Sequence, residues 1–267
     1  MLRYSLDQAT TINWTFEQDI RHFASLGVQA VSVQNRKLQA YGSDKGKQLL
    51  RDAGMKISAL LSAGFFTLTD ASKWPAQLET AKRMIGTATE IGAERLLLQA
   101  GPCGAMSYEE AEARFKHLLG ELLKEAERHR MPLCLEPNNA LRVDLGYIHS
   151  LHDGLDLADE VDSPLFTICF ETSNMWIERR LYENIARRTK RIGLVQLNDV
   201  KAGTYFTPSR VPMGDGIIPV GRIVDAFEQA HYQGYYDIEI VGPEVERLGY
   251  EETIRRALEW VKKREGR

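Results

Sequence analysis

Cysteine is scarce in this chain of 267 residues, which has only Cys103, Cys134 and Cys169. An odd number at such wide spacing argues against a disulfide framework or a cysteine-rich zinc site. Long apolar runs are also lacking, because none approaches the roughly 20 residues that a bilayer-crossing helix needs. The first residues lack the extended apolar stretch of a signal peptide. We therefore expect a cytoplasmic protein without a membrane partner, in which Cys134 and Cys169 are small core residues.

A strong charge of one sign is absent as well. The chain has 34 Lys and Arg against 37 Asp and Glu, which gives a formal net charge of -3, and its pI is about 6.1. This balance gives no support to the binding of nucleic acid or of an anionic membrane surface. We expect a small molecule as the partner.

Short apolar, β-branched segments alternate with longer helical patterns along the chain, which is typical of parallel βαβ units. Eight strands are predicted, at residues 3–6, 30–33, 56–60, 95–99, 132–136, 166–171, 192–197 and 236–241. No linker, low-complexity tract or fixed-period repeat divides them. The predicted fold class is α/β, a single (β/α)8 TIM barrel domain over residues 1–267. The alternative is a doubly wound open sheet, which would usually place a glycine-rich loop after its first strand, whereas residues 10–14 (TTINW) contain no glycine.

Polar side chains stand at the ends of the last four predicted strands. In an eight-stranded barrel the active site lies at the C-terminal mouth, where such side chains meet. Alternation along each strand places four of them on the inward side, next to apolar neighbours. They are Glu136, Glu171, Gln196 and Glu239. Three carboxylates in a small dry site repel one another unless a positive charge lies among them.

Two sources of that charge are open at this point. Arg210, in the loop beyond the seventh strand, is the nearest basic side chain. A divalent cation is the simpler answer, because three carboxylates with the carbonyl oxygen of Gln196 suit Mg²⁺ or Mn²⁺. In the alternative without a metal, Gln196 satisfies backbone groups at the barrel rim, and the glutamates protonate or pair with neighbouring basic residues.

Several stretches, taken in order along the chain, carry a resemblance to a known family. They are residues 58–66 (SALLSAGFF), 135–137 (LEP), 171–176 (ETSNMW) and 196–199 (QLND), Arg210 followed by 213–218 (MGDGII), and Glu239. Together they resemble the xylose isomerase-like TIM-barrel group of sugar phosphate isomerases and epimerases, over most of the chain. The resemblance implies a metal held at the positions of Glu136, Glu171, Gln196 and Glu239, where the family usually has Glu, Asp, His and Glu.

Three positions depart from the family pattern. Glu171 stands for the usual Asp, Gln196 for the usual metal-binding His, and Asn174 for a His that contacts the substrate. Replacing an imidazole by a carboxamide should lower the affinity for Zn²⁺ and favour Mg²⁺, Mn²⁺ or Ca²⁺. The departures are also compatible with loss of the metal, although the three anionic positions argue for its retention.

The chemistry that the resemblance implies is proton transfer next to a sugar carbonyl group. A metal would polarise the carbonyl, and Glu136 and Glu239 would act as the acid/base pair through an enediolate. Isomerisation, epimerisation and loss of a β-substituent need nearly the same residues. A lyase acting on 3-oxo-glycosides or inosose-like substrates is therefore the alternative to an isomerase or epimerase.

Further roles at the mouth are hypotheses of the same kind. Arg210 and Asn174 are candidate substrate contacts, the first through its fork of donors. Phe66, together with Phe65, forms either an apolar wall of the site or part of the packing at the barrel top. The same two interpretations apply to Trp176.

Asp199 follows the seventh predicted strand directly. It either orients a ligand from behind or caps the loop that follows.

Two other functions are weighed against this one. Endonuclease IV shares the barrel family, but its zinc cluster requires many histidines. Here His22, His117, His129 and His231 fall in predicted helical segments, while His149 and His152 follow the fifth strand and its loop. A non-catalytic sugar-binding or accessory subunit is suggested by the three departures, whereas the presence of both Glu136 and Glu239 favours an enzyme. A homo-oligomer or hetero-complex is expected by resemblance alone.

Overall fold

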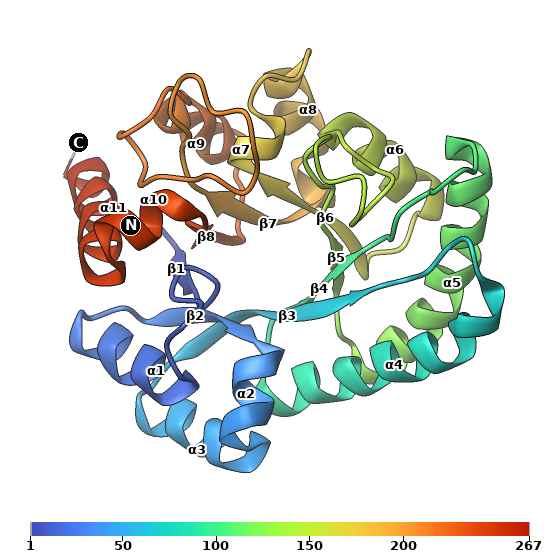
Figure 1. The fold of residues 1–267 in the computed structure, drawn as a ribbon, viewed down its shortest axis with the longest axis horizontal. Coiled ribbons are helices and arrows are strands. Elements are labelled where there is room, and N and C mark those ends of the chain that lie inside the picture. Colours follow the sequence, from blue (N-terminus) through green and yellow to red (C-terminus); the bar gives the residue numbers. More distant parts are fainter. Residues whose placement is uncertain (1, 267) are drawn as a thin grey trace.

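Within residues 2–266, eight parallel strands close into a barrel in the order β1 to β8, and helices surround it (Figure 1). This computed structural model describes those residues with all of their side chains except the side chains of residues 62–65. The strands are β1 (Tyr4–Asp7), β2 (Ala30–Gln34), β3 (Lys56–Phe65), β4 (Leu96–Gln99), β5 (Leu133–Leu135), β6 (Phe166–Glu171), β7 (Ile192–Leu197) and β8 (Tyr235–Ile238).

The helices cover the outside of this barrel, with shorter ones at its rim (Figure 1). They are α1 (Phe16–Ser25), α2 (Asn35–Tyr41), α3 (Ser43–Asp52), α4 (Trp74–Ile91), α5 (Tyr108–His129), α6 (Leu151–Val161), α7 (Thr172–Met175), α8 (Leu181–Arg188), α9 (Val220–Gln229), α10 (Pro243–Leu248) and α11 (Tyr250–Glu265). Two short 3-10 helices, at Ala71–Lys73 and Thr189–Arg191, precede α4 and β7. None of the helices in the described part combines the length and apolar character that crossing a bilayer requires.

The predicted fold class is confirmed, because each predicted strand corresponds to an observed one. β6 and β7 have the predicted limits, whereas β3 runs five residues further than predicted. β5 stops ahead of Pro137, which has no N–H to continue a ladder. β8 ends at Ile238, because the N–H of Ile240 donates to the hydroxyl of Thr10 at 3.0 Å instead of to a strand.

Side chains alternate between the barrel interior and the helical layer, as the sequence predicts. The interior positions form an apolar cluster of their own. It consists of Ala30, Ala59, Leu61, Leu97, Cys134, Cys169, Leu194 and Tyr235. Cys134 and Cys169 are thus core residues with free thiols. Two residues further toward the C-terminal ends of β6 and β7, the inward-facing residues are polar. Gln196 lies in register with Glu171 on one neighbouring strand and with Asp237 on the other.

The larger apolar cluster lies between the strands and the helices, since each long helix buries one face. α5 illustrates how the sequence sets this up. Ser107 and Glu110 form a capping box at its start, which satisfies backbone donors that the first turn leaves free. Phe115, Leu118 and Leu122 then recur at helical spacing and are buried. Such faces stabilise the barrel and place its mouth.

Candidate active site

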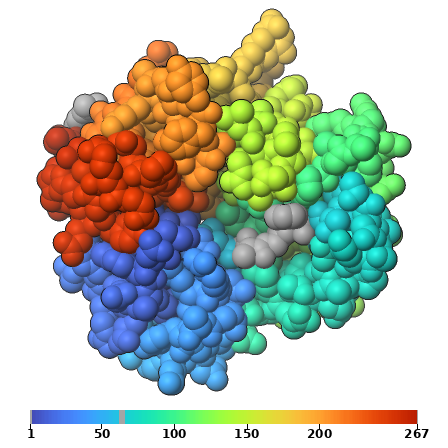
Figure 2. Space-filling model, viewed as in Figure 1, coloured from blue at the N-terminus to red at the C-terminus, as the bar shows by residue number. Residues whose placement is uncertain are grey.

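A cavity of about 180 Å³ opens at the C-terminal ends of the strands. It is lined by Ala9, Gln99, Glu136, Asn138, Asn139, Arg142, Leu145, Asn174, Thr207, Pro208, Arg210, Glu239 and Val241. Figure 2 shows this face hollowed between the loop after β5, in lime, and the loop after β7, in orange. This is the end of a parallel barrel at which strand-end side chains converge. Polar groups therefore dominate a space that suits a small polar molecule.

Arg210 lies among the predicted carboxylates and is 7% exposed. Its Nη1 forms an ion pair with Glu239, and its Nε lies 3.4 Å from Oε1 of Glu171. Glu136 lines the same cavity, and its charge, like those of the other two, raises the pKa of Arg210 against the effect of burial. A guanidinium group thus supplies the counter-charge for Glu171 and Glu239, the two carboxylates that it contacts.

The backbone around Arg210 is held on both sides by neighbouring strand ends. Its N–H donates to the carbonyl of Val241 at 3.0 Å, and Val211 pairs with Asp199 in both directions at 2.8 and 3.0 Å. The carboxylate of Asp199 accepts hydrogen bonds from the backbone N–H groups of Val200, Gly214, Gly216 and Ile218, at 2.8 to 3.1 Å. Of its two predicted roles, Asp199 has that of capping the loop, and the cap fixes the segment that carries Arg210.

Glu171 is fully buried and also serves as the N-cap of α7. Its oxygens accept hydrogen bonds from the N–H of Asn174 at 2.7 Å, from the N–H of Ser173 at 3.2 Å and from the Ser173 hydroxyl at 2.8 and 2.9 Å. The amide of Asn198 donates to it as well. A carboxylate with this many donors is held in one orientation, facing Arg210.

Gln196 points into the barrel rather than toward Arg210. Its Oε1 accepts from the Cys169 thiol at 3.3 Å, and its Nε2 lies 3.5 Å from Oδ2 of Asp7. Asp7 and Asp237 form a buried acidic pair there, with the hydroxyl of Ser5 donating to Asp237 at 2.5 Å. Burial, then the neighbouring charge of Asp237, raises the pKa of Asp7 well above its usual range. The carboxamide thus belongs to an internal network below the cavity.

The two carboxyl groups that are expected to transfer protons have different electrostatic surroundings. Burial, followed by the charge of Glu239, raises the pKa of Glu136 to about 8, and Arg210 only partly opposes this. Burial also raises the pKa of Glu239, but its direct ion pair with Arg210 opposes the shift and favours the carboxylate. The raised pKa favours the carboxylic acid at Glu136 near neutral pH, whereas the ion pair with Arg210 favours the carboxylate at Glu239.

Two carbonyl oxygens in the cavity lining have no hydrogen-bond partner within the described part of the chain. They are the Oδ1 atoms of Asn138 and Asn174, both buried. A buried acceptor without a donor is costly, by about 1–3 kcal/mol, unless a ligand or water satisfies it. These atoms could accept hydrogen bonds from hydroxyl groups of a bound molecule.

Four of the predicted site residues meet in this cavity, namely Glu136, Asn174, Arg210 and Glu239. Glu171 lies directly behind Arg210. The cavity lining does not include Phe66, which is buried in the outer apolar cluster, or Trp176, which packs against that cluster. The side chain of Phe65 lies outside those that the structure describes.

The histidines stay away from the strand ends, as predicted. His22, His117 and His129 lie in helices, whereas His231 lies in the turn after α9. The turn arises because α9 ends at Gln229 and His231 takes a left-handed conformation, with φ of 56°. His149 is tied to the loop after β5, where its Nδ1 lies 3.0 Å from the carbonyl oxygen of Asn138.

Comparison with known proteins decides the family. A family model described as xylose isomerase-like TIM barrel matches residues 20–264. The chain belongs to this family. A curated relative, the L-ribulose-5-phosphate 3-epimerase UlaE of Salmonella paratyphi A, is 25% identical over 191 residues, or 70% of this chain. The match covers 63% of that relative, so the chain spans less than two thirds of its length.

Several solved structures superpose closely on this barrel. The IolI protein, solved with a bound zinc atom, has a TM-score of 0.88 at 17% identity, covering 98% of each chain. The 3-keto-D-glucoside 4-epimerase YcjR from E. coli, in its apo form, has a TM-score of 0.82 at 17% identity, covering 98% of this chain and all of that one. At these identities the likeness establishes the fold alone.

Membership of this family implies a divalent ion, and the donor set of this chain can be tested against one. Within the described residues, no group of three or more His, Cys, Asp and Glu side chains is placed to hold a metal ion. The oxygen of Gln196 already accepts from Cys169, and Arg210 stands between Glu171 and Glu239. As arranged, the four residues do not fit a resident divalent ion.

Arg142 and Asn198 are site residues that sequence reasoning gave no role. Arg142 lines the cavity from the loop after β5, and its guanidinium is paired with Asp144 through two contacts of 2.9 Å. No periodicity extends into that loop, so only the tertiary structure could find it. Asn198 lies two residues after Gln196, so alternation puts it on the same side of the chain, and its contact with Glu171 follows from that position.

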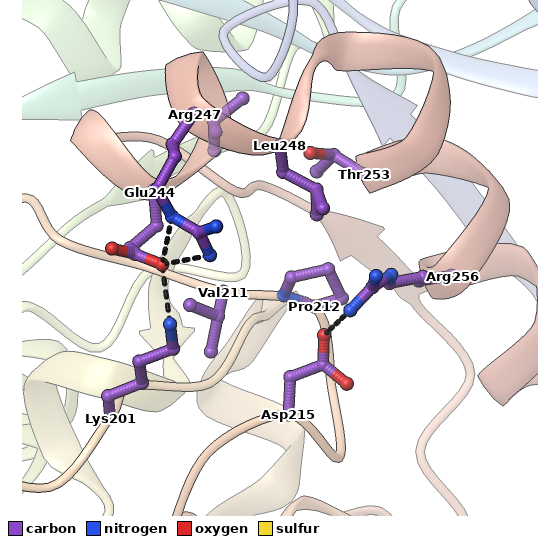
Figure 3. Close-up of a pocket in the computed structure, with 10 residues that line it drawn as sticks. Lys201, Val211, Pro212, Asp215, Glu244, Arg247, Leu248, Thr253 and Arg256 are labelled. Atoms are coloured by element: carbon purple, nitrogen blue, oxygen red, sulfur yellow. Dashed lines mark hydrogen bonds and ion pairs between the residues drawn. The ribbon is translucent and has the colours of Figure 1, made fainter.

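A second pocket of about 200 Å³ lies on the other side of the segment that carries Arg210, against α10 and α11. Figure 3 shows how its charges are arranged: Lys201 and Arg247 both reach Glu244, at 2.5 and 2.9 Å, and Arg256 reaches Asp215 at 3.0 Å. Each of these cations already has a carboxylate partner, so the pocket presents no unpaired charge to a ligand.

Proposed function

We propose that the chain is a sugar isomerase or epimerase that moves a proton at a carbon next to a carbonyl group. The observation that carries the proposal is the pair of carboxyl groups, Glu136 and Glu239, that line one small cavity with Arg210, which forms an ion pair with Glu239. The UlaE relatives, named as epimerases of a sugar phosphate, support the reaction class. β5 and β8 lie three strands apart around the barrel, so the two groups approach a ligand from different sides.

The proton transfer follows from these groups. The carboxylate of Glu239 takes the proton from the carbon next to the carbonyl, and the C–H electron pair forms a double bond while the carbonyl oxygen becomes an enediolate oxygen. N–H donors of Arg210 stabilise that negative charge. The carboxylic acid of Glu136 then delivers a proton to the opposite face or to the adjacent carbon, and the carbonyl re-forms. The turnover leaves the proton on Glu239 and the negative charge on Glu136, and exchange of protons with solvent restores the starting arrangement.

The lining suits a polyhydroxylated substrate. The free acceptors of Asn138 and Asn174 can receive hydroxyl hydrogens, and a cavity of about 180 Å³ has room for a small sugar or sugar derivative. Arg142, which is about one-third exposed, adds a positive charge at the edge. Its pair with Asp144 is exposed and contributes little free energy, so an anionic substituent of a sugar can displace the aspartate.

A screen of three substrate classes in D₂O tests the proposal. We expect the protein to catalyse deuterium incorporation next to the carbonyl of at least one ketose, ketose phosphate or 3-oxo-glycoside, detected by NMR and mass spectrometry. Product analysis then separates the reactions: a stereoisomer indicates an epimerase, an aldose indicates an isomerase, and a released aglycone indicates the lyase. Absence of exchange with all three classes would refute the proposed function.

The direction of the pH dependence follows from the pKa of Glu136, which burial raises to about 8. The two carboxyl groups must hold one proton between them for the transfer in either direction, so kcat/KM should fall in both directions as the pH rises through about 8. The two profiles should run in parallel, because the ratio of the two kcat/KM values equals an equilibrium constant that does not depend on pH. A kcat/KM that stays constant across this range would contradict these roles.

The same group links stability to pH. The pKa of Glu136 is raised to about 8 in the folded chain, so the folded state binds the Glu136 proton more tightly than the unfolded state does. The free energy of unfolding should therefore be highest at low pH and should decrease as the pH rises toward about 8. Urea unfolding measures this decrease, and the decrease should be smaller in Glu136→Gln.

A further inference from the structure

The positive charge at the centre of the site comes from a side chain of the protein. Arg210 is almost fully buried, contacts Glu239 and lies 3.4 Å from Glu171, and it feels the charge of Glu136. Buried carboxylates are stable only with a compensating cation close by. Arg210 already meets that requirement for Glu171 and Glu239.

The positions that would complete a metal site are committed elsewhere. The side-chain oxygen of Gln196 accepts a hydrogen bond from the Cys169 thiol, and its nitrogen faces Asp7. Gln196 therefore does not turn its oxygen toward the cavity as a metal ligand. Glu171 is occupied by the N–H groups and hydroxyl that begin α7, and by Asn198. A metal ion at this position would have to displace Arg210 and break several of these hydrogen bonds.

The guanidinium of Arg210 is only partly committed to the carboxylates. Arg210 lines the cavity, its Nη1 donates to Glu239, and its buried Nε faces Oε1 of Glu171 at 3.4 Å. The guanidinium has five N–H groups, so it can hold Glu239 and still donate to a substrate oxygen. Such a donor stabilises a developing enediolate in the way that a metal ion would.

We propose that this chain works without a divalent metal, and that Arg210 is the electrophilic residue which polarises the substrate carbonyl. The inference rests on the proposed function for its chemistry, since Arg210 stabilises the enediolate while Glu239 and Glu136 exchange the proton. Its prediction about metal content is independent of any substrate. On this proposal, Glu171 and Gln196 differ from the Asp and His of the family pattern because the cation of the site is an arginine and not a metal ion.

The test measures metal binding and stability before activity. Native protein is purified with and without chelator, its metal content is measured by mass spectrometry, and Mg²⁺, Mn²⁺, Ca²⁺ and Zn²⁺ are titrated by calorimetry and thermal unfolding. We expect no stoichiometric ion, no change of Tm with EDTA, and deuterium exchange that persists in EDTA. One tightly bound ion per chain, with loss of Tm or of exchange on its removal, would overturn the proposal.

Variants separate Arg210 from its surroundings. Arg210→Met should lower the exchange rate by about 10²- to 10³-fold, the effect of removing one preorganised donor, and free guanidinium should partly restore it. Arg210→Lys keeps the charge without the fork and covers the case in which the first variant fails to fold.

Arg255→Met, on the exposed face of α11, is the matched control and should behave as native. Full exchange activity in folded Arg210→Met would also overturn the proposal. If no substrate class shows exchange, the proposed function fails while the metal measurements still decide the content of the site.

Discussion

Glu136→Gln and Glu239→Gln are each expected to lower turnover by about 10²- to 10⁴-fold, the usual contribution of a positioned acid or base. The two variants should differ in deuterium exchange. Glu136→Gln still has the base that removes the proton from one substrate, so that substrate should continue to exchange with solvent. Glu239→Gln should retain exchange only with the other substrate of the pair. NMR of both substrates in D₂O measures this asymmetry.

The control for this pair is Glu244→Gln, which removes a carboxylate of similar size in the second pocket, away from the cavity. It should leave exchange unchanged in both directions. Equal loss of exchange from both substrates in each variant would mean that one carboxyl group performs both transfers. Unchanged turnover in either variant would remove that residue from the mechanism.

Lys37→Met should destabilise the fold by about 3–5 kcal/mol, the cost of leaving one partner of a buried ion pair without the other. Lys37 and Asp19 are both buried, and their charged atoms lie 2.7 Å apart. The same lysine donates to the carbonyl of Thr11 at 2.7 Å, and the Thr11 hydroxyl donates to Asp19 at 2.6 Å. This group ties α1, α2 and the loop after β1 together. Urea unfolding measures the loss.

The size of that loss should depend on pH. Burial raises the pKa of Asp19 to about 6 even with Lys37 beside it, so removal of the lysine should raise it further. Below pH 6 the aspartate is increasingly neutral and needs no cation, and the destabilisation by Lys37→Met should shrink. Lys82→Met is the surface control, because its pair with Glu79 is exposed and contributes at most about 1 kcal/mol. An equal loss of unfolding free energy in both variants would show that the buried Lys37–Asp19 pair stabilises the fold no more than a surface pair does.

The predicted site shows how far local pattern reaches. Alternation along the strands placed Glu136, Glu171 and Glu239 at one end of the barrel, and they do gather there. It also placed Gln196 on the inward side, which is correct for its strand position. Alternation does not predict the direction of the Gln196 carboxamide within the barrel, because that direction depends on a contact with Asp7 of β1.

Arg210 shows the limit most clearly. The sequence offered it and a metal ion as two sources of the same charge. Its position depends on Asp199 capping the loop and on a backbone contact with Val241 beyond the last strand, and neither contact has a periodic signature. Arg142 was not anticipated at all for the same reason, since it lies in an irregular loop.

Hydrophobic periodicity and the alternation of side chains were enough to define the eight strands, their order, their inward and outward faces, and the end of the barrel at which the acidic residues meet. Both signals are local properties of the chain, so they can be read without any knowledge of its neighbours in space. The folded molecule was needed to establish that Arg210 lies between the carboxylates, that Gln196 joins a network below them, and that Phe66 packs in the core. Those outcomes depend on contacts between residues far apart in sequence, where the direction of a side chain is set by partners that no local pattern specifies.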